Sequence, residues 1–478
     1  MEWPWQPLTS YDSCVCAEAP CSHVVELARA EVQTNPNADQ RLRVFAGIRI
    51  ADAEVGCHQV FQRYGLSAAV EIEKLELFGM KDFPYIPFST WAQYLLDTNR
   101  FTRQLCGCRD FNTMRSVLIE FWSRYHALFP NHEIFSKADA GEVALERTVP
   151  FFSHTDEGRS QKHDPLWVLS CHGALGRGTR LYLKMRKHRK AVGQNEMGLN
   201  FVGQTWSTQF LLATVLKRKV EDFDTSLELL LRKFSEDCSN LATRGLSHEG
   251  QTIWLLHLGT KGDLPALNKA GGFTRTFLNV PKRPSTKTPC EGICFLCLGG
   301  QESNPRTGAA DVPYEDLGEN PIWEGTMHSV EPWTQRPEIV GNTPVNHARL
   351  ADFFCLDLWH CFHLGVCKHF VASALAVIAE SGLLPRSSME MKFQSMTREY
   401  RDFCRDQKLP LWITEISRET LNFPQGSALP LGKWNKGSCS TTMMLFLNFY
   451  CNKFINGKTD DPVLLMIVPC FLVFIIFF

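Results

Sequence analysis

The sequence predicts an α/β protein built on a mixed sheet, and the order of elements between residues 148 and 270 is the main reason. Three short apolar and β-branched runs are typical of strands: they cover 148–154, 166–171 and 179–183. A helical pattern then extends over about 207–241, and a fourth strand, 252–258, continues towards Asp263. A further helix begins over 264–270. We therefore expect a sheet whose first and fourth strands each lead to an acidic residue.

The composition is that of a globular protein with two to four domains. The chain has 478 residues, of which 44% are hydrophobic and 21% charged, and its formal net charge is −1. This balance does not favour nucleic-acid binding, because domains that bind nucleic acids are often strongly basic. The basic run 184–190 is a local exception, although a solvated loop is its simpler interpretation. The 18 cysteines, with no secretory signal, indicate reduced thiols and a metal cluster rather than disulfides.

The rest of the chain divides into segments of different character. The predicted segments are an irregular segment 1–40, a helical domain 41–147, a core 148–382 with an insertion at about 281–356, a helical region 383–462 and an apolar tail 463–478. In the helical domain the pattern is helical over about 59–136, with a break at Pro84 and Pro87 and an amphipathic helix around 114–125. The strongest helix prediction is 357–380, and further helices are expected over 389–406 and 441–454.

The apolar tail 463–478 is short for a membrane span, which needs roughly 20 residues, and Pro469 interrupts it. A tail anchor and a truncated or misread gene end are both compatible with it. At the other end, Cys14, Cys16, Cys21 and His23 form a weak zinc candidate, because their spacing lacks paired Cys-x-x-Cys turns.

Asp156 and Asp263 are the acidic residues that the two strands deliver. Three strands, a helix and a fourth strand carrying an acid is the order of an RNase H-like sheet, in which such residues lie side by side. Carboxylates in this position suit Mg²⁺ or Mn²⁺ and two-metal phosphoryl transfer. Each aspartate taken singly is also a typical turn residue after a strand.

Cys290, Cys294 and Cys297 form a second candidate site. The Cys294-x-x-Cys297 step matches the ligand pairing of tetrahedral Zn²⁺ sites. His360 and His363, three residues apart on one predicted helix, are the expected remaining ligands, and Cys290 is an alternative to either histidine. Buried reduced thiols and two core histidines are the competing interpretation. We expect a structural zinc that ties the insertion to the long helix.

The order of these motifs resembles the DDE transposases of the CACTA-like group and the related recombination-activating recombinases. The block 357–366, Asp-Leu-Trp-His-Cys-Phe-His-Leu-Gly-Val, is similar to the Asp-x-Met-His...Leu-Gly-Val segment common in CACTA-type transposases. Residues 261–264 resemble their second-acid segment, and their zinc-binding insertion likewise falls between the second and third acids. The similarity covers roughly 148–382, about half of the chain.

The resemblance implies an RNase H-like core that cleaves DNA at the ends of an element. Water attacks the phosphodiester, and the freed 3′-hydroxyl then attacks target DNA. Transposon ends and target DNA are the implied partners, Mg²⁺ or Mn²⁺ the catalytic cation and Zn²⁺ the structural one. Nuclear localisation and a homo-oligomeric assembly are implied as well.

Two positions depart from the family pattern. Asp156 is followed by Glu157 rather than directly by Gly, and Leu364 stands where some members carry Glu. The third acid therefore has two candidates. Glu380 lies near the end of the long helix, and we choose it over Asp357, because an acid at a helix start is often only a cap.

Two other functions are compatible with the sequence. One is a catalytically inactive, zinc-stabilised derivative that binds DNA or protein. The other is a tail-anchored membrane protein with an unrelated soluble domain. Metal-dependent nicking of DNA separates the first alternative from a transposase, and membrane fractionation separates the second.

Overall fold

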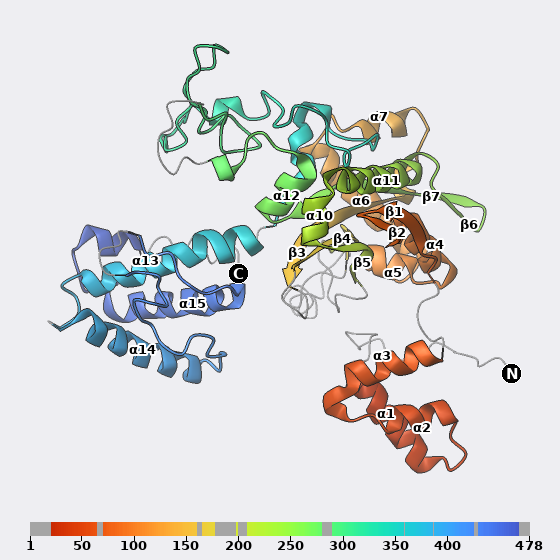
Figure 1. Cartoon of the computed structure of the whole chain (residues 1–478), viewed down its shortest axis with the longest axis horizontal. Coiled ribbons are helices and arrows are strands. Elements are labelled where there is room, and N and C mark those ends of the chain that lie inside the picture. Colours follow the sequence, from red (N-terminus) through yellow and green to blue (C-terminus); the bar gives the residue numbers. More distant parts are fainter. Residues whose placement is uncertain are drawn as a thin grey trace. The chain divides into compact units, whose positions relative to one another are not determined.

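The computed structural model divides the chain into two compact units, Met1–Cys355 and Leu356–Phe478 (Figure 1). The described residues are 21–64, 70–159, 165–176, 197–198, 208–279, 289–357, 359–385, 387–424 and 429–467. The expected strand 179–183, the basic run 184–190, Cys14 and Cys16 lie outside these ranges. The units are mixed α/β and helical, respectively.

Three short helices with a core of their own begin the described chain. They are α1 (Cys21–Thr34), α2 (Gln40–Ala46) and α3 (Ala53–Arg63). Val25, Phe45, Cys57 and Val60 are buried between them. The region 21–34, which we expected to be irregular, is therefore helical. Its apolar residues pack against α2 and α3, although their spacing in the sequence does not show a strong helical periodicity.

The helical prediction for 59–136 holds over the end of α3 but is wrong over 73–85, which forms a hairpin. Strands β1 (Glu73–Leu77) and β2 (Met80–Tyr85) pair antiparallel. Phe78 and Gly79 both have positive φ, as a two-residue hairpin turn requires. The inward-facing residues of β1 alternate with exposed ones, so the period is two rather than 3.6.

The helices expected after the hairpin are present. They are α4 (Phe88–Asp97), α5 (Phe101–Cys106), α6 (Phe111–Leu128) and α7 (Glu133–Asp139). Helix α6 begins at its N-cap Asp110, whose carboxylate accepts a hydrogen bond from the Thr113 amide, and it buries the predicted apolar face. Helix α4 has Pro87 as its N-cap and no side-chain cap.

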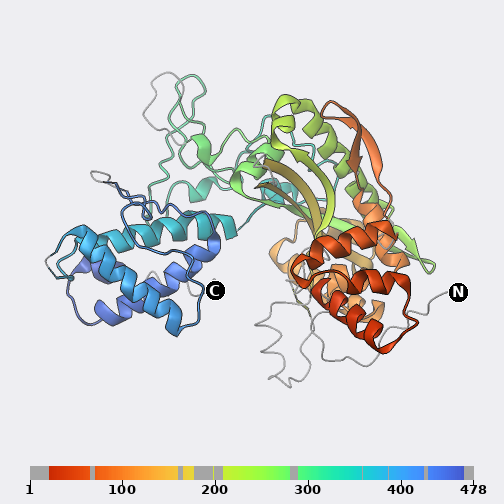
Figure 2. The ribbon, with the colours of Figure 1, turned by 60° about the horizontal axis from the view of Figure 1, so that its bottom comes forward.

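A curled mixed sheet forms the centre of the first unit (Figures 1 and 2). Its strands are β3 (Thr148–Arg159), β4 (Pro165–Gly173), β5 (Phe210–Leu216), β6 (Leu246–His248), β7 (Gln251–Gly262) and β8 (Phe354–Leu356). The order is β5-β4-β3-β7-β6, and β8 also pairs with β7. Strands β3, β4 and β5 are antiparallel neighbours, whereas β7 runs parallel to β3.

The predicted helix 207–241 is wrong over 210–216, which is strand β5. Phe210, Leu212 and Val215 are buried while Leu211 and Thr214 are exposed, and the strand pairs with β4 along its length. Pairing with an existing strand outweighed the helix-like spacing of these apolar residues. The helical part is divided into α10 (Lys217–Asp222) and α11 (Asp224–Thr243).

The two faces of the sheet differ. On β3 the side chains of Val149, Phe151, Ser153 and Thr155 are fully buried, and Phe152, His154 and Asp156 on the other face are half-buried. Helix α4 covers the buried face, since the rings of Phe88 and Phe151 lie 4.4 Å apart. Helix α11 covers it as well, through Phe234 beside His257.

The segment between the sheet and the second unit is mostly irregular, as predicted. After α12 (Leu264–Gly271), residues 289–346 form turns and isolated bridges with one short 3₁₀ helix, Glu324–Thr326. A second 3₁₀ helix, His347–Phe353, leads into β8.

The second unit is helical. A π-helix, Trp359–Val366, continues as α13 (Cys367–Glu380), followed by α14 (Met389–Asp406) and α15 (Gly437–Phe454). By length and composition alone, Trp359–Glu380 would suffice to cross a membrane, a property shared by the core helices of soluble proteins. Within this unit Val371, Leu375 and Ile378 are buried in the helical core. Leu464 and Ile467 belong to that core too, so the expected apolar tail begins inside it, and 468–478 lie outside the described residues.

Candidate functional site

Asp156 and Asp263 are brought together by the register of β3 and β7. Thr155 is the parallel partner of Gly262, so each aspartate is the next residue after this pair: Asp156 lies within β3, and Asp263 directly follows β7. Neighbouring strands lie about 4.8 Å apart, and side chains at matching positions point to the same face. Both aspartates are half-buried. Strand pairing thus sets the two positions side by side along β3 and β7, the strands labelled in Figure 1, and the juxtaposition of their carboxylates stays a prediction.

Asp263 also has a structural role. Its Oδ1 accepts a 2.8 Å hydrogen bond from the Ala266 amide, so it is the N-cap of α12. A carboxylate has two oxygens and about four acceptor positions, so one capping bond does not exhaust it. The turn function that we weighed as the alternative therefore exists alongside the position expected of a cation ligand.

Lysines balance the charge at this edge. Glu157, next to Asp156, pairs with Lys217 at 2.5 Å and with Lys269 at 3.6 Å. The hydrogen bond that Lys217 donates to Glu157 raises the pKa of Lys217, and the charges of Glu157, Glu221 and Asp263 raise it further. Lys217 and Lys269 were not singled out from the sequence, where Glu157 was noted only as a departure from the family pattern.

A histidine lies fully buried beneath the acidic edge. His257 Nε2 accepts from the Ser153 amide at 3.3 Å and lies 2.9 Å from Ser153 Oγ, which in turn contacts Thr260 Oγ1 at 2.8 Å. Burial lowers the pKa of His257 to about 3. Since no part of this group reaches the surface, we assign it to the core rather than to catalysis.

The cysteine loop, residues 289–299, has the local geometry of a sulfur site. Backbone amides two residues further on donate to each sulfur: Gly292 to Cys290, Leu296 to Cys294 and Gly299 to Cys297, each at 3.4 Å. A hydrogen bond between the side chains of Cys294 and Cys297 lowers the pKa of Cys294 to about 6. The same hydrogen bond raises the pKa of Cys297. Such amide bonds favour thiolates, the form in which cysteine binds Zn²⁺.

Arg275 anchors this loop by hydrogen bonds and was not predicted from the sequence. The residue is 4% exposed, and its guanidinium donates to four backbone carbonyls. The acceptors are Cys294 and Cys297 in the cysteine loop and Val330 and Glu331 further along the insertion. Arg275 therefore connects both cysteine carbonyls to the other side of the insertion, and nothing in the local sequence indicated this role.

The predicted histidine ligands belong to the second unit, whereas the cysteines belong to the first. His360 Nδ1 lies 2.6 Å from Asp357 Oδ2, the contact that commonly orients a metal-binding histidine. His363 is buried, lies 3.2 Å from Thr441 Oγ1 and packs against Trp359. Both lie on the π-helix rather than on the α-helix that we assumed, so the three-residue spacing does not place them as predicted. Their role as ligands stays a prediction.

The two candidates for the third acid differ in their surroundings. Asp357 Oδ1 accepts from the Trp359 amide at 2.8 Å, and its Oδ2 contacts His360. It therefore has the capping role that we weighed against catalysis. Glu380 is exposed at the end of α13.

A different group of potential metal ligands lies in the N-terminal helices. Cys21 on α1 and Glu54 and His58 on α3 place one sulfur, one oxygen and one nitrogen within 4.8 Å of one another. Of the weak zinc candidate predicted near the N-terminus, Cys21 belongs to this group and His23 is exposed on α1. Glu54 and His58 come from the next part of the chain and were not predicted.

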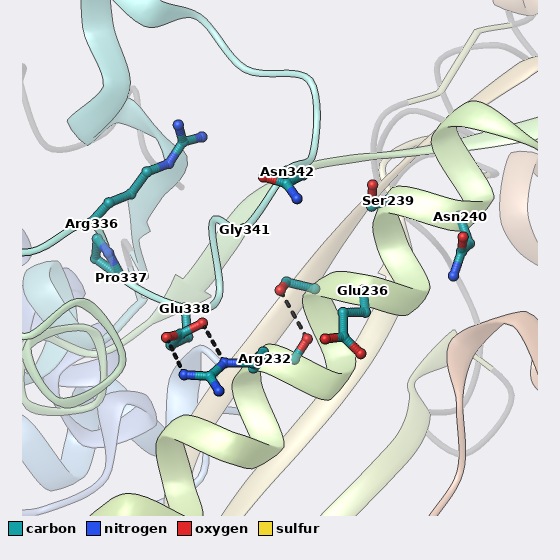
Figure 3. Close-up of a pocket in the computed structure, with 10 residues that line it drawn as sticks. Arg232, Glu236, Ser239, Asn240, Arg336, Pro337, Glu338, Gly341 and Asn342 are labelled. Atoms are coloured by element: carbon teal, nitrogen blue, oxygen red, sulfur yellow. Dashed lines mark hydrogen bonds and ion pairs between the residues drawn. The ribbon is translucent and has the colours of Figure 1, made fainter.

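A cavity of about 500 Å³ lies between α11 and residues 336–342 (Figure 3). Two of its lining residues, Arg232 and Glu338, are joined by a two-bond ion pair of 2.7 and 3.0 Å. None of the acidic or cysteine residues predicted from the sequence lines this cavity. Because Arg232, a cation that lines this cavity, is already paired with Glu338, we do not assign the reaction to the cavity.

Comparisons with known proteins do not identify a family for this chain, so its function is argued from the residues described above. No protein-family model matches the chain, and no curated protein matches it. The carboxylate pair and the cysteine loop are the two features from which a function is argued.

Proposed function

We propose that the chain is a DDE-type DNA transposase, or a derivative of one, with an RNase H-like core. The observation that carries the proposal is the parallel pairing of β3 and β7, which sets Asp156 beside Asp263. The strand order, with three antiparallel strands and a fourth parallel to the first, supports the same core. So does the helical crossover α10–α11 that precedes β7.

Asp156 and Asp263 would hold Mg²⁺ or Mn²⁺, since both offer carboxylate oxygens at one edge of the sheet. When bound, such cations stabilise the attacking and leaving oxygens of a phosphoryl transfer. Lys217 and Lys269 neutralise Glu157 and keep a third negative charge from adding to the repulsion between the aspartates.

A structural Zn²⁺ at the cysteine loop belongs to the same proposal. The three amide–sulfur bonds and the support of Arg275 fit thiolate ligation by Cys294 and Cys297. Cys290 is a further candidate ligand within the loop, and ligation by His360 and His363 stays a prediction from the sequence. DNA is the proposed partner of the whole chain, and a nuclear location and an oligomeric assembly follow from that activity alone.

The test is nicking of supercoiled plasmid DNA by the full chain with Mn²⁺ or Mg²⁺. We expect activity that a chelator removes and that Asp156→Asn and Asp263→Asn each abolish while DNA binding persists. Asp110→Asn is the matched control, because Asp110 caps α6 with a 2.8 Å bond just as Asp263 caps α12. Asn retains both caps, so lost folding does not explain lost cleavage.

Two results would reject catalysis. One is full activity in both aspartate variants, and the other is a folded, DNA-binding wild-type chain with no metal-dependent nicking. The second result would favour the inactive binding derivative, which the capping role of Asp263 also fits.

A further inference from the structure

The N-terminal helices hold mixed donors that belong to no other feature of the molecule. Glu54 and His58 are one helical turn apart on α3, and Cys21 opens α1 beside them. This arrangement does not depend on the carboxylate pair or on the cysteine loop. It therefore stands whether or not the chain cleaves DNA.

Packing holds the two helices so that the donors meet. Cys57, fully buried on α3, donates from its thiol to the Cys21 carbonyl at 3.7 Å. Arg29 on α1 donates to the carbonyls of Ala46 and Ile48, which fixes α1 against the link between α2 and α3. The start of α1 is thus tied to the face of α3 that carries Glu54 and His58.

The chemistry of the donors selects the cation. Thiolate and imidazole favour Zn²⁺ over Mg²⁺ or Ca²⁺, and carboxylate is an accepted third ligand. Tetrahedral Zn²⁺ places its ligand atoms about 3.5 Å apart. The three donor atoms already lie within 4.8 Å of one another. The side chains of Glu54 and His58 are each 72% exposed, so small rotations can close the remaining gap.

We propose that Cys21, Glu54 and His58 form a Zn²⁺ site that clamps α1 to α3. The site uses three protein ligands from two helices, and its exposed side leaves the fourth position to solvent. Its binding free energy adds to the stability of a three-helix unit whose own core is small.

The experiment measures zinc bound to the full chain by elemental analysis and by titration after chelation. His58→Gln and Glu54→Gln alter exposed side chains, so both should fold, as circular dichroism would verify. We expect His58→Gln to lose about one zinc per chain and Glu54→Gln to bind at least tenfold more weakly. His23→Gln, an exposed histidine on α1, is the matched control and should retain the metal.

Further variants distinguish zinc bound at this site from zinc bound at the cysteine loop. A Cys294→Ser/Cys297→Ser chain should keep the zinc that is sensitive to His58→Gln. With Co²⁺, Cys21→Ser should remove one thiolate-to-cobalt absorption that His23→Gln leaves unchanged. Equal zinc content in the His58→Gln and His23→Gln chains would overturn the proposal.

Discussion

The acidic edge of the sheet and the cysteine loop are both suited to cations, but the chain builds them in opposite ways. Asp156 and Asp263 are far apart in the sequence and meet because β3 and β7 pair in parallel. The cysteine sulfurs are instead each set by an amide two residues away. The first depends on the whole sheet and the second on local backbone, so damage to one should leave the other intact.

The largest effect should come from the acidic edge. Asp156→Asn or Asp263→Asn should lower Mn²⁺-dependent nicking by about 10³-fold, since several kcal/mol of transition-state stabilisation depend on the cation. Zinc content and the unfolding midpoint should change little. Plasmid nicking and elemental analysis on the same preparations test this. Loss of zinc in either variant would show that the two regions are not independent.

The two candidates for the third acid distinguish a catalytic role from a helix-capping role. Glu380→Gln should abolish nicking while DNA binding persists, and Asp357→Asn should reduce nicking less, because Asp357 caps the π-helix and contacts His360. Gel-shift and nicking assays on both variants measure the difference. An active Glu380→Gln chain together with a dead Asp357→Asn chain would reverse the assignment.

Damage to the cysteine loop should affect stability before activity. Cys294→Ser/Cys297→Ser should release about one zinc and lower the unfolding midpoint by about 5 °C or more, because zinc affinity in such sites is folding free energy. Cys290→Ser should have a smaller effect, since that sulfur also contacts the Asn279 carbonyl. Calorimetry with metal analysis tests both. An equal loss of zinc in Cys290→Ser would make Cys290 a ligand.

The last prediction concerns the pH dependence of the stability of the sheet. Because burial lowers the pKa of His257 to about 3, the unfolded chain binds a proton there before the folded chain does. Stability therefore falls as pH drops from about 6.5 towards 3, by about 1.4 kcal/mol per unit for this residue. His257→Gln should flatten that slope, measured by urea unfolding at several pH values. An unchanged slope in His257→Gln would contradict the assignment.

Local patterns allowed much of the chain to be predicted. The periodic apolar residues of α6 and α14 define their own helices, as do most of those in α15. Strands β3, β4 and β7 and the irregular insertion also follow from short-range composition. The cysteine loop could be recognised because a Cys-x-x-Cys step and its amide bonds lie within a few residues.

Where the prediction failed, distant partners decided the outcome. Residues 210–216 become a strand because β4 offers them an edge, and 73–85 form a hairpin because one side of it packs on the core. The π-helical start of Trp359–Glu380 changes where His360 and His363 lie around the axis. The spacing of apolar residues in the local sequence could not have predicted these two strand regions or the π-helix.

The residue types available for cation binding, and most of the elements that carry them, could be identified from the amino-acid sequence, because side-chain chemistry and hydrophobic periodicity act over short distances. Which of those residues meet depends instead on how the chain folds. The register of β3 and β7 sets Asp156 beside Asp263, and the packing of α1 on α3 gathers Cys21, Glu54 and His58. Such contacts arise because burial of apolar surface drives distant segments together, and that free energy belongs to the assembled fold.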